Sequence, residues 1–61
     1  MLISSENLKV GDTLVTKWRG HNSTIHHFEQ YNGCFDFILK TAVFADGARM
    51  SIEKGHSYEC I

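Results

Sequence analysis

The chain has 61 residues, of which 43% are hydrophobic and 21% charged, and its formal net charge at pH 7 is -1. This length predicts one small domain, residues 1–61, with no room for a second domain or a deep cleft. The near-neutral charge argues against a strong, sequence-independent nucleic-acid binder, because such proteins carry a large net positive charge. No apolar run approaches the roughly 20 residues that cross a bilayer, and the first residues lack the pattern of a secretory signal. We therefore expect a cytoplasmic protein.

The first third of the sequence predicts a turn, a strand and a loop. Ser4–Leu8 places a serine before a segment with Glu and Asn, which suits one helical or 3₁₀ turn. Gly11 follows in a turn, where it is free to adopt positive φ. Thr13–Trp18 is β-branched and aromatic and predicts a strand. The polar segment Arg19–Thr24 predicts the longest loop.

Asn32-Gly33 is the preferred dipeptide of a two-residue type I′ hairpin. Closing this turn pairs Phe28 with Phe37. It also sets Glu29 opposite Asp36, where like charges are destabilising. Either solvent screens the pair or a basic side chain such as that of Lys40, Arg49 or Lys54 lies close, or the pair is an acidic spot that meets a basic group of a partner. The face expected in the core carries Phe28, Phe35, Phe37, Leu39, Thr41, Val43 and Ala45.

A second turn dipeptide, Asp46-Gly47, continues the same pattern. Its hairpin pairs Val43 with Met50, so that apolar residues again face each other, and the two hairpins form a three-stranded antiparallel meander. Tyr58–Ile61 predicts a short final strand after a turn at Lys54–Ser57. The predicted fold class is all-β, a five-stranded small barrel.

Five short strands around a central meander resemble the SH3-like small β-barrels, in which the first and last strands close the sheet. The segment Leu8–Val15 (LKVGDTLV) is similar to the start of the first strand in many such barrels. The chain lacks the acidic and aromatic ALYDY-type stretch of the peptide-binding SH3 domains, so the resemblance does not imply their proline-rich ligands. A chain of this size also resembles the small accessory proteins of phages, which implies a host protein as partner.

The candidates for metal binding and catalysis are poorly placed. His27, Glu29 and Asp36 offer an imidazole and two carboxylates, but alternate residues of a strand stand roughly 6.6 Å apart. His56 and Cys60 would stand roughly 13 Å apart on the final strand, too far to share a zinc ion. Cys34 could pair with a histidine as a nucleophile, but no feature lowers its thiol pKa or supplies an oxyanion hole. We expect no metal, no cofactor and no enzymatic activity, with both cysteines as free thiols.

The outward face of the predicted meander holds three apolar residues, Ile25, Ile38 and Phe44, which could form a patch for a partner protein or for a second copy of the chain. The sequence therefore predicts a non-enzymatic small binding protein, of the kind that a phage uses to modulate or inhibit a host protein. The candidate contact residues are Ile38, Phe44 and Tyr31, with Lys40, Arg49, Glu29 and Asp36 as the polar rim.

The alternative function is binding of single-stranded nucleic acid through Lys17, Trp18 and Arg19, which combine two cations with an aromatic ring. Against this alternative, Trp18 shares a face of the predicted strand with Leu14 and Thr16, which predicts that it belongs to the core.

Overall fold

Six short strands and two 3₁₀ turns form the fold in the computed structural model, which describes residues 1–61 and contains no α-helix. The strands are β1 (Leu2–Ser4), β2 (Thr13–Leu14), β3 (Ser23–Glu29), β4 (Ile38–Phe44), β5 (Arg49–Glu53) and β6 (Ser57–Glu59). The 3₁₀ turns are η1 (Ser5–Asn7) and η2 (Lys17–Arg19). The all-β class and the three-stranded antiparallel meander, β3–β4–β5, are confirmed. The strands number six where the sequence predicts five.

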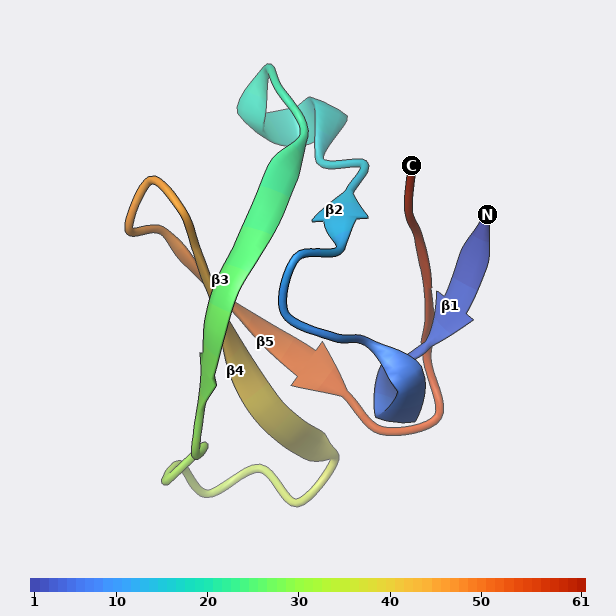
Figure 1. Ribbon diagram of the computed structural model, residues 1–61. Helices are drawn as coiled ribbons and strands as arrows, with labels where there is room; N and C mark the ends of the chain where they lie inside the picture. Colours follow the sequence, from blue (N-terminus) through green and yellow to red (C-terminus); the bar gives the residue numbers. More distant parts are fainter.

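The sheet curls into a small barrel-like shape (Figure 1). Its four-stranded part has the order β2-β3-β4-β5, and β1 pairs with β6 in a second, two-stranded sheet. The C-terminal segment joins the two sheets, because Cys60 forms a bridge with Leu14 and the Ile61 N–H donates to the Thr13 carbonyl at 2.9 Å. The first and last strands therefore lie side by side next to the meander, and both chain termini end on one side of the molecule (Figure 1). The first strand, Leu2–Ser4, is one that the sequence did not predict.

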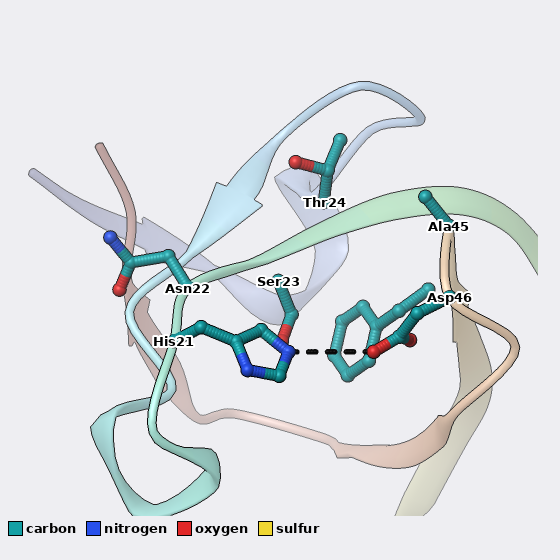
Figure 2. A pocket seen from close by; sticks show the side chains of 7 residues that line it. His21, Asn22, Ser23, Thr24, Ala45 and Asp46 are labelled. Atoms are coloured by element: carbon teal, nitrogen blue, oxygen red, sulfur yellow. Dashed lines mark hydrogen bonds and ion pairs between the residues drawn. The ribbon is translucent and has the colours of Figure 1, made fainter.

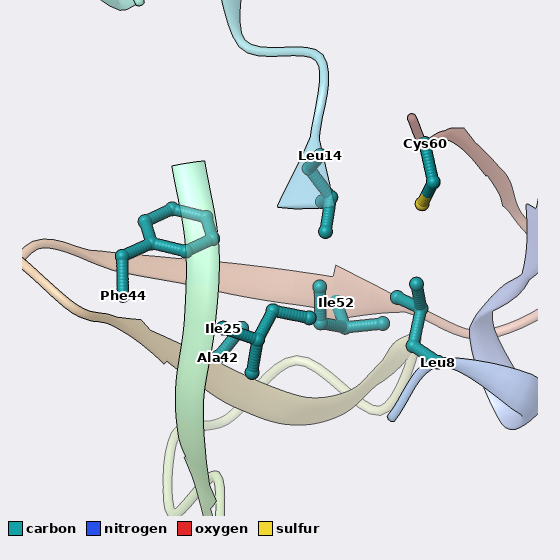
Figure 3. Packing of buried hydrophobic residues seen from close by; sticks show 7 residues of the cluster. All are labelled: Leu8, Leu14, Ile25, Ala42, Phe44, Ile52 and Cys60. Carbon is teal, nitrogen blue, oxygen red and sulfur yellow. The ribbon is translucent and has the colours of Figure 1, made fainter. Parts of the chain in front are cut away.

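The core lies between the curled sheet and the terminal strands. It is a cluster of seven buried residues: Leu8, Leu14, Ile25, Ala42, Phe44, Ile52 and Cys60 (Figure 3). Half-buried side chains such as Phe28 and Tyr58 pack around this cluster. The members come from β2, β3, β4, β5 and from segments near both termini, so the core connects all parts of the chain.

The first predicted hairpin is wrong in register. Glu29 pairs with Thr41 rather than facing Asp36, and Ile25 pairs with Phe44. A type I′ turn needs positive φ at both central residues, and neither Asn32 nor Gly33 has it. The chain instead forms an eight-residue loop, Gln30–Phe37, between β3 and β4. The observed register buries Ile25 and Phe44 in the core, which the predicted register would have left outside.

The second hairpin is present, but it is shifted by one residue. Val43 pairs with Arg49 and Ala42 pairs with Met50, where the sequence predicted Val43 opposite Met50. The turn has three residues, Ala45–Gly47, and Gly47 has φ of 92°. Three-residue hairpin loops commonly end on a left-handed residue of this kind. A one-residue slip exchanges the two faces of a strand, and in the observed register Ala42 and Phe44 of β4 lie in the core.

Because of the two register changes, several residues predicted to lie in the core are exposed, and several predicted to lie on the surface are buried. Ile25 and Phe44 are 1% and 2% exposed, so the expectation that they face outward is wrong. Phe35 and Phe37 are 56% and 48% exposed, so the expectation that they belong to the core is also wrong. Val43 is buried but stands outside the core cluster, between His27 and Arg49 in the strand register.

The N-terminal third is partly as expected. The 3₁₀ turn η1 and the positive φ of Gly11 (95°) are confirmed. The strand predicted over Thr13–Trp18 ends at Leu14, because the Thr16 hydroxyl donates to the His21 carbonyl at 2.6 Å and the chain turns into η2. Trp18, on η2, is 73% exposed, so its predicted place in the core is wrong. The final strand is present as β6, with Cys60 directly after it.

Candidate functional site

The segment Gln30–Phe37, here named the aromatic loop, displays the most prominent exposed aromatic pair of the molecule. The rings of Phe35 and Phe37 contact each other with centroids 5.3 Å apart and planes tilted by 43°. Each ring keeps about half of its surface exposed, as given above. Two adjacent exposed phenylalanines form a continuous apolar surface, whereas a single exposed apolar residue would need no explanation.

Hydrogen bonds and one close contact hold the aromatic loop in place. The Lys54 N–H donates to the Phe37 carbonyl at 2.8 Å, and the Ile38 N–H donates to the Phe35 carbonyl at 3.3 Å. The Tyr31 ring covers Gly33 so closely that any side chain at Gly33 would clash with it. The phenylalanine rings therefore stand on a loop whose backbone is hydrogen-bonded to Lys54, directly after β5, and to the start of β4.

Three of the predicted contact and rim residues belong to this loop or directly adjoin it. Tyr31 and Asp36 are in the aromatic loop, and Ile38 is the first residue of β4. Tyr31 and Ile38 are half-buried, and Asp36 is exposed. Phe44, predicted as a central contact residue, lies in the core, which removes it from the surface of this fold. The sequence did not predict Phe35 and Phe37 as surface residues.

The remaining rim residues lie on the strands next to the loop. The Arg49 guanidinium contacts the Glu29 carboxylate at 3.3 Å, so one of the three basic residues that the sequence offered as neighbours of Glu29 does lie beside it. The Lys40 ammonium lies 4.0 Å from the centroid of the Phe28 ring, a cation–π contact. The predicted repulsion between Glu29 and Asp36 does not arise, because these residues are not strand partners.

A second group of polar residues surrounds η2, at the opposite end of β3 from the aromatic loop (Figure 1). The Arg19 guanidinium donates to the Asp46 carboxylate and to the Ser23 hydroxyl, and it lies over the Phe44 ring, 5.3 Å from its centroid. Ser23 also shares a hydrogen bond of 2.7 Å with Thr16, and both hydroxyls are buried. This network holds η2 in place, and the side chain of Trp18 projects from η2 into solvent.

A shallow pocket of about 190 Å³ lies next to this network (Figure 2). Its lining consists of His21, Asn22, Ser23, Thr24, Phe44, Ala45 and Asp46. The His21 ring nitrogen Nε2 lies 3.4 Å from the Asp46 carboxylate. The Ala48 N–H, then Arg19 and His21, hold the pKa of Asp46 below its ordinary value. The Ser23 hydroxyl is hydrogen-bonded to Thr16 and Arg19 and not to His21. Ser23 and His21 are therefore not arranged as a nucleophile and its general base.

The cysteines and most of the histidines do not converge on a common site. No group of three or more His, Cys, Asp or Glu side chains is placed to hold a metal ion. Cys34 is exposed in the aromatic loop, and Cys60 is buried in the core, where burial raises the pKa of its thiol. The His56 ring packs against Tyr58, with centroids 4.7 Å apart.

No family model, curated protein or solved structure matches the chain. None of its helical segments is long and apolar enough to cross a membrane.

One feature of the sequence could have predicted the aromatic loop. Pairing Ile25 with Phe44 aligns two segments rich in β-branched and aromatic residues, Ser23–Phe28 and Thr41–Phe44, and leaves the residues around Asn32-Gly33 as a long loop. The preference of Asn-Gly for a tight turn favours the other register. The network around Arg19 had no local signal, because Asp46 lies 27 residues away in the sequence.

Proposed function

We propose that this protein is a non-enzymatic binding module that contacts another protein through the aromatic loop. The observation that carries the proposal is the exposed, mutually packed pair Phe35 and Phe37 on a loop that hydrogen bonds hold in place. Aromatic residues are enriched in the buried centres of protein interfaces, where a few of them supply most of the binding energy.

The surroundings of the pair match the anatomy of an interface. Half-buried Tyr31 and Ile38 lie in the loop or next to it, Asp36 is exposed in the loop, and Glu29, the residue before the loop, pairs with Arg49 from β5, so charged groups accompany the apolar ones as in an interface rim. Burying a whole Phe side chain contributes about 1.5–3 kcal/mol, so removing the exposed half of each ring from water contributes about 1 kcal/mol. The two rings together therefore supply about 2 kcal/mol before any polar contact is counted.

The architectural resemblance to the SH3-like small barrels, which include the peptide-binding SH3 domains, supports a binding role. The resemblance of the chain to small phage accessory proteins supports a host protein as that partner, which the chain would modulate or inhibit in the cytoplasm. In this proposal Phe35 and Phe37 take the central place that the sequence had assigned to Phe44.

Capture of partners from a lysate of the native host tests the proposal. Immobilised wild-type protein and the double variant Phe35→Ser/Phe37→Ser are compared, after nuclease treatment. The matched control is Val10→Ser, which removes an apolar side chain that is 61% exposed and lies outside the aromatic loop. We expect a protein that wild type and the control retain and the double variant loses. Retention by all three proteins would contradict the proposal.

The second candidate is binding of single-stranded nucleic acid at η2. The 73% exposure of Trp18 favours it, because an exposed ring offers a stacking platform for a base. The pairing of Arg19 with Asp46 weakens it, since Lys17 is then the only one of the two flanking cations without an acidic partner. Binding of an oligonucleotide that Trp18→Ala abolishes, and that falls steeply with salt, would favour this candidate over the first.

A further inference from the structure

His26 and His27 are consecutive residues whose rings meet on the surface of β3. Side chains of consecutive residues on a regular strand point to opposite faces of the sheet. Here the register between β3 and β4 shifts between Ile25 and His27, which is the mark of a β-bulge. The two ring centroids are 5.1 Å apart, with planes nearly perpendicular at 81°, and the two Nδ1 atoms approach to 2.8 Å.

The carboxylate of Glu29 determines which nitrogen of His27 is available. Its Oε2 lies 3.3 Å from His27 Nε2, and a carboxylate can only accept a hydrogen bond, so Nε2 carries the proton in this contact. In the neutral ring Nδ1 then has the free electron pair, and it faces His26 Nδ1. Arg49 contacts Glu29 from the other side at 3.3 Å and helps to keep the carboxylate in place.

These features match the requirements of a metal-binding histidine pair. Histidines that bind a metal through one ring nitrogen usually donate the other N–H to a carboxylate or carbonyl, as His27 does to Glu29. Two nitrogens bound at about 2.0 Å to one metal, at a right angle, are about 2.8 Å apart. The observed separation of 2.8 Å is that of the hydrogen bond between the two Nδ1 atoms, and it also equals the separation of adjacent positions in a square-planar or octahedral centre, so both atoms can reach one metal ion once that hydrogen bond is broken. A tetrahedral centre would need a separation of about 3.3 Å.

We propose that His26 and His27 form a surface site for a late divalent transition metal, Cu(II) or Ni(II), through their two Nδ1 atoms. In the neutral pair the proton between the two Nδ1 atoms is the single ring proton of His26, and metal binding moves it to Nε2 of the same ring, so that both Nδ1 atoms are free to bind the metal and no proton is lost. Only two protein donors converge there, so water fills the remaining coordination positions. Glu29 is a positioning residue, because it holds the His27 tautomer and does not contact the metal. This metal site does not rest on the protein-binding function proposed above, although both proposals involve Glu29 and Arg49.

Calorimetric titration of the folded protein with Ni(II) alone tests the site. We expect one metal per chain in the wild type, and affinities lower by about tenfold or more in His26→Ala and in His27→Ala. His56→Ala is the matched control, because His56 is exposed on the turn before β6, away from β3, and it should keep the wild-type affinity. Equal affinity of wild type and His26→Ala would overturn the proposal, as would loss of binding in His56→Ala.

Electron paramagnetic resonance with Cu(II) detects the nitrogen atoms bound to the metal, and this result does not depend on the stability of the protein. The measurement uses the Cys34→Ser background, because the exposed Cys34 thiol would reduce Cu(II). We expect hyperfine coupling to two imidazole nitrogens in this background and to one after His26→Ala. Glu29→Gln should keep both couplings but weaken binding by about tenfold, as loss of an outer carboxylate does. A spectrum without nitrogen coupling in the parent protein would contradict the assignment.

Discussion

Truncation of Phe44 should unfold much of the protein, whereas truncation of Phe37 should be tolerated. Phe44 is 2% exposed and belongs to the core cluster, and Phe→Ala changes in a core cost about 3–5 kcal/mol. A chain of 61 residues has a total stability of about 3–9 kcal/mol, so Phe44→Ala removes a large part of it or all of it. Phe37 is 48% exposed, and losing its buried half costs about 1 kcal/mol.

Urea denaturation followed by far-ultraviolet circular dichroism measures the difference. Fluorescence is less suitable, because Trp18 is already exposed in the folded protein. With a slope of about 1 kcal/mol per M urea, the low end for small proteins, Phe44→Ala lowers the midpoint by about 3 M or leaves no folded baseline. Phe37→Ala lowers it by about 1 M.

Phe44→Leu keeps the measurement informative if Phe44→Ala does not fold. It retains most of the apolar volume but removes the ring that faces Arg19, and it should cost less than about 1.5 kcal/mol. The register predicted from the tight Asn-Gly turn gives the opposite ranking, with Phe37 in the core and Phe44 outside. A midpoint for Phe44→Ala within about 1 M of wild type, or a larger loss in Phe37→Ala, would refute the observed register.

Three further predictions concern the second hairpin, the response to acid and the two thiols. Gly47→Ala should destabilise the fold by about 1–2 kcal/mol in urea, because Gly47 has φ of 92° and an L-residue is strained there; an unchanged midpoint would argue against this turn geometry. The pKa of Asp46 is lowered in the folded state, so its stabilising contribution is complete above its ordinary pKa and is lost as pH falls through the lower folded value. The melting temperature should therefore fall less on acidification in Asp46→Asn than in wild type, and parallel curves would contradict this. Cys34 should react quickly with a thiol reagent and Cys60 only on unfolding, because Cys60 is buried with a raised thiol pKa; equal rates in the native protein would show that Cys60 is accessible.

The fold class could be predicted from the sequence because it depends on features that act over short distances. The β-branched and aromatic segments and the turn glycines predicted an all-β chain, a central meander and a short turn at η1, and all three are present. The second hairpin was also placed at Asp46-Gly47, although its turn has three residues and its register is shifted by one residue. These local preferences do not depend on which face of a strand is buried.

The faces could not be predicted because they depend on register, and register is decided by the whole core. The Asn-Gly preference acts on two residues, whereas the observed register lets Ile25 and Phe44 join Leu14 and Ile52 in one cluster. Burying each of these large side chains contributes about 1.5–3 kcal/mol, which outweighs the preference for one turn type. The candidate site changed for the same reason, because an inverted register brought Phe35 and Phe37 to the surface and took Phe44 away from it.

The most direct test of the proposed function is the affinity of a captured partner for wild type, Phe35→Ser/Phe37→Ser and Trp18→Ala, measured at about 50 and 200 mM salt. A protein partner held by the aromatic loop should bind the double variant at least about tenfold more weakly, because two anchors of about 1 kcal/mol each are lost. Trp18→Ala should bind as wild type does, and salt should change the affinity little. Undiminished binding by Phe35→Ser/Phe37→Ser, together with loss of binding in Trp18→Ala and a steep dependence on salt, would contradict the proposal and assign the function to η2.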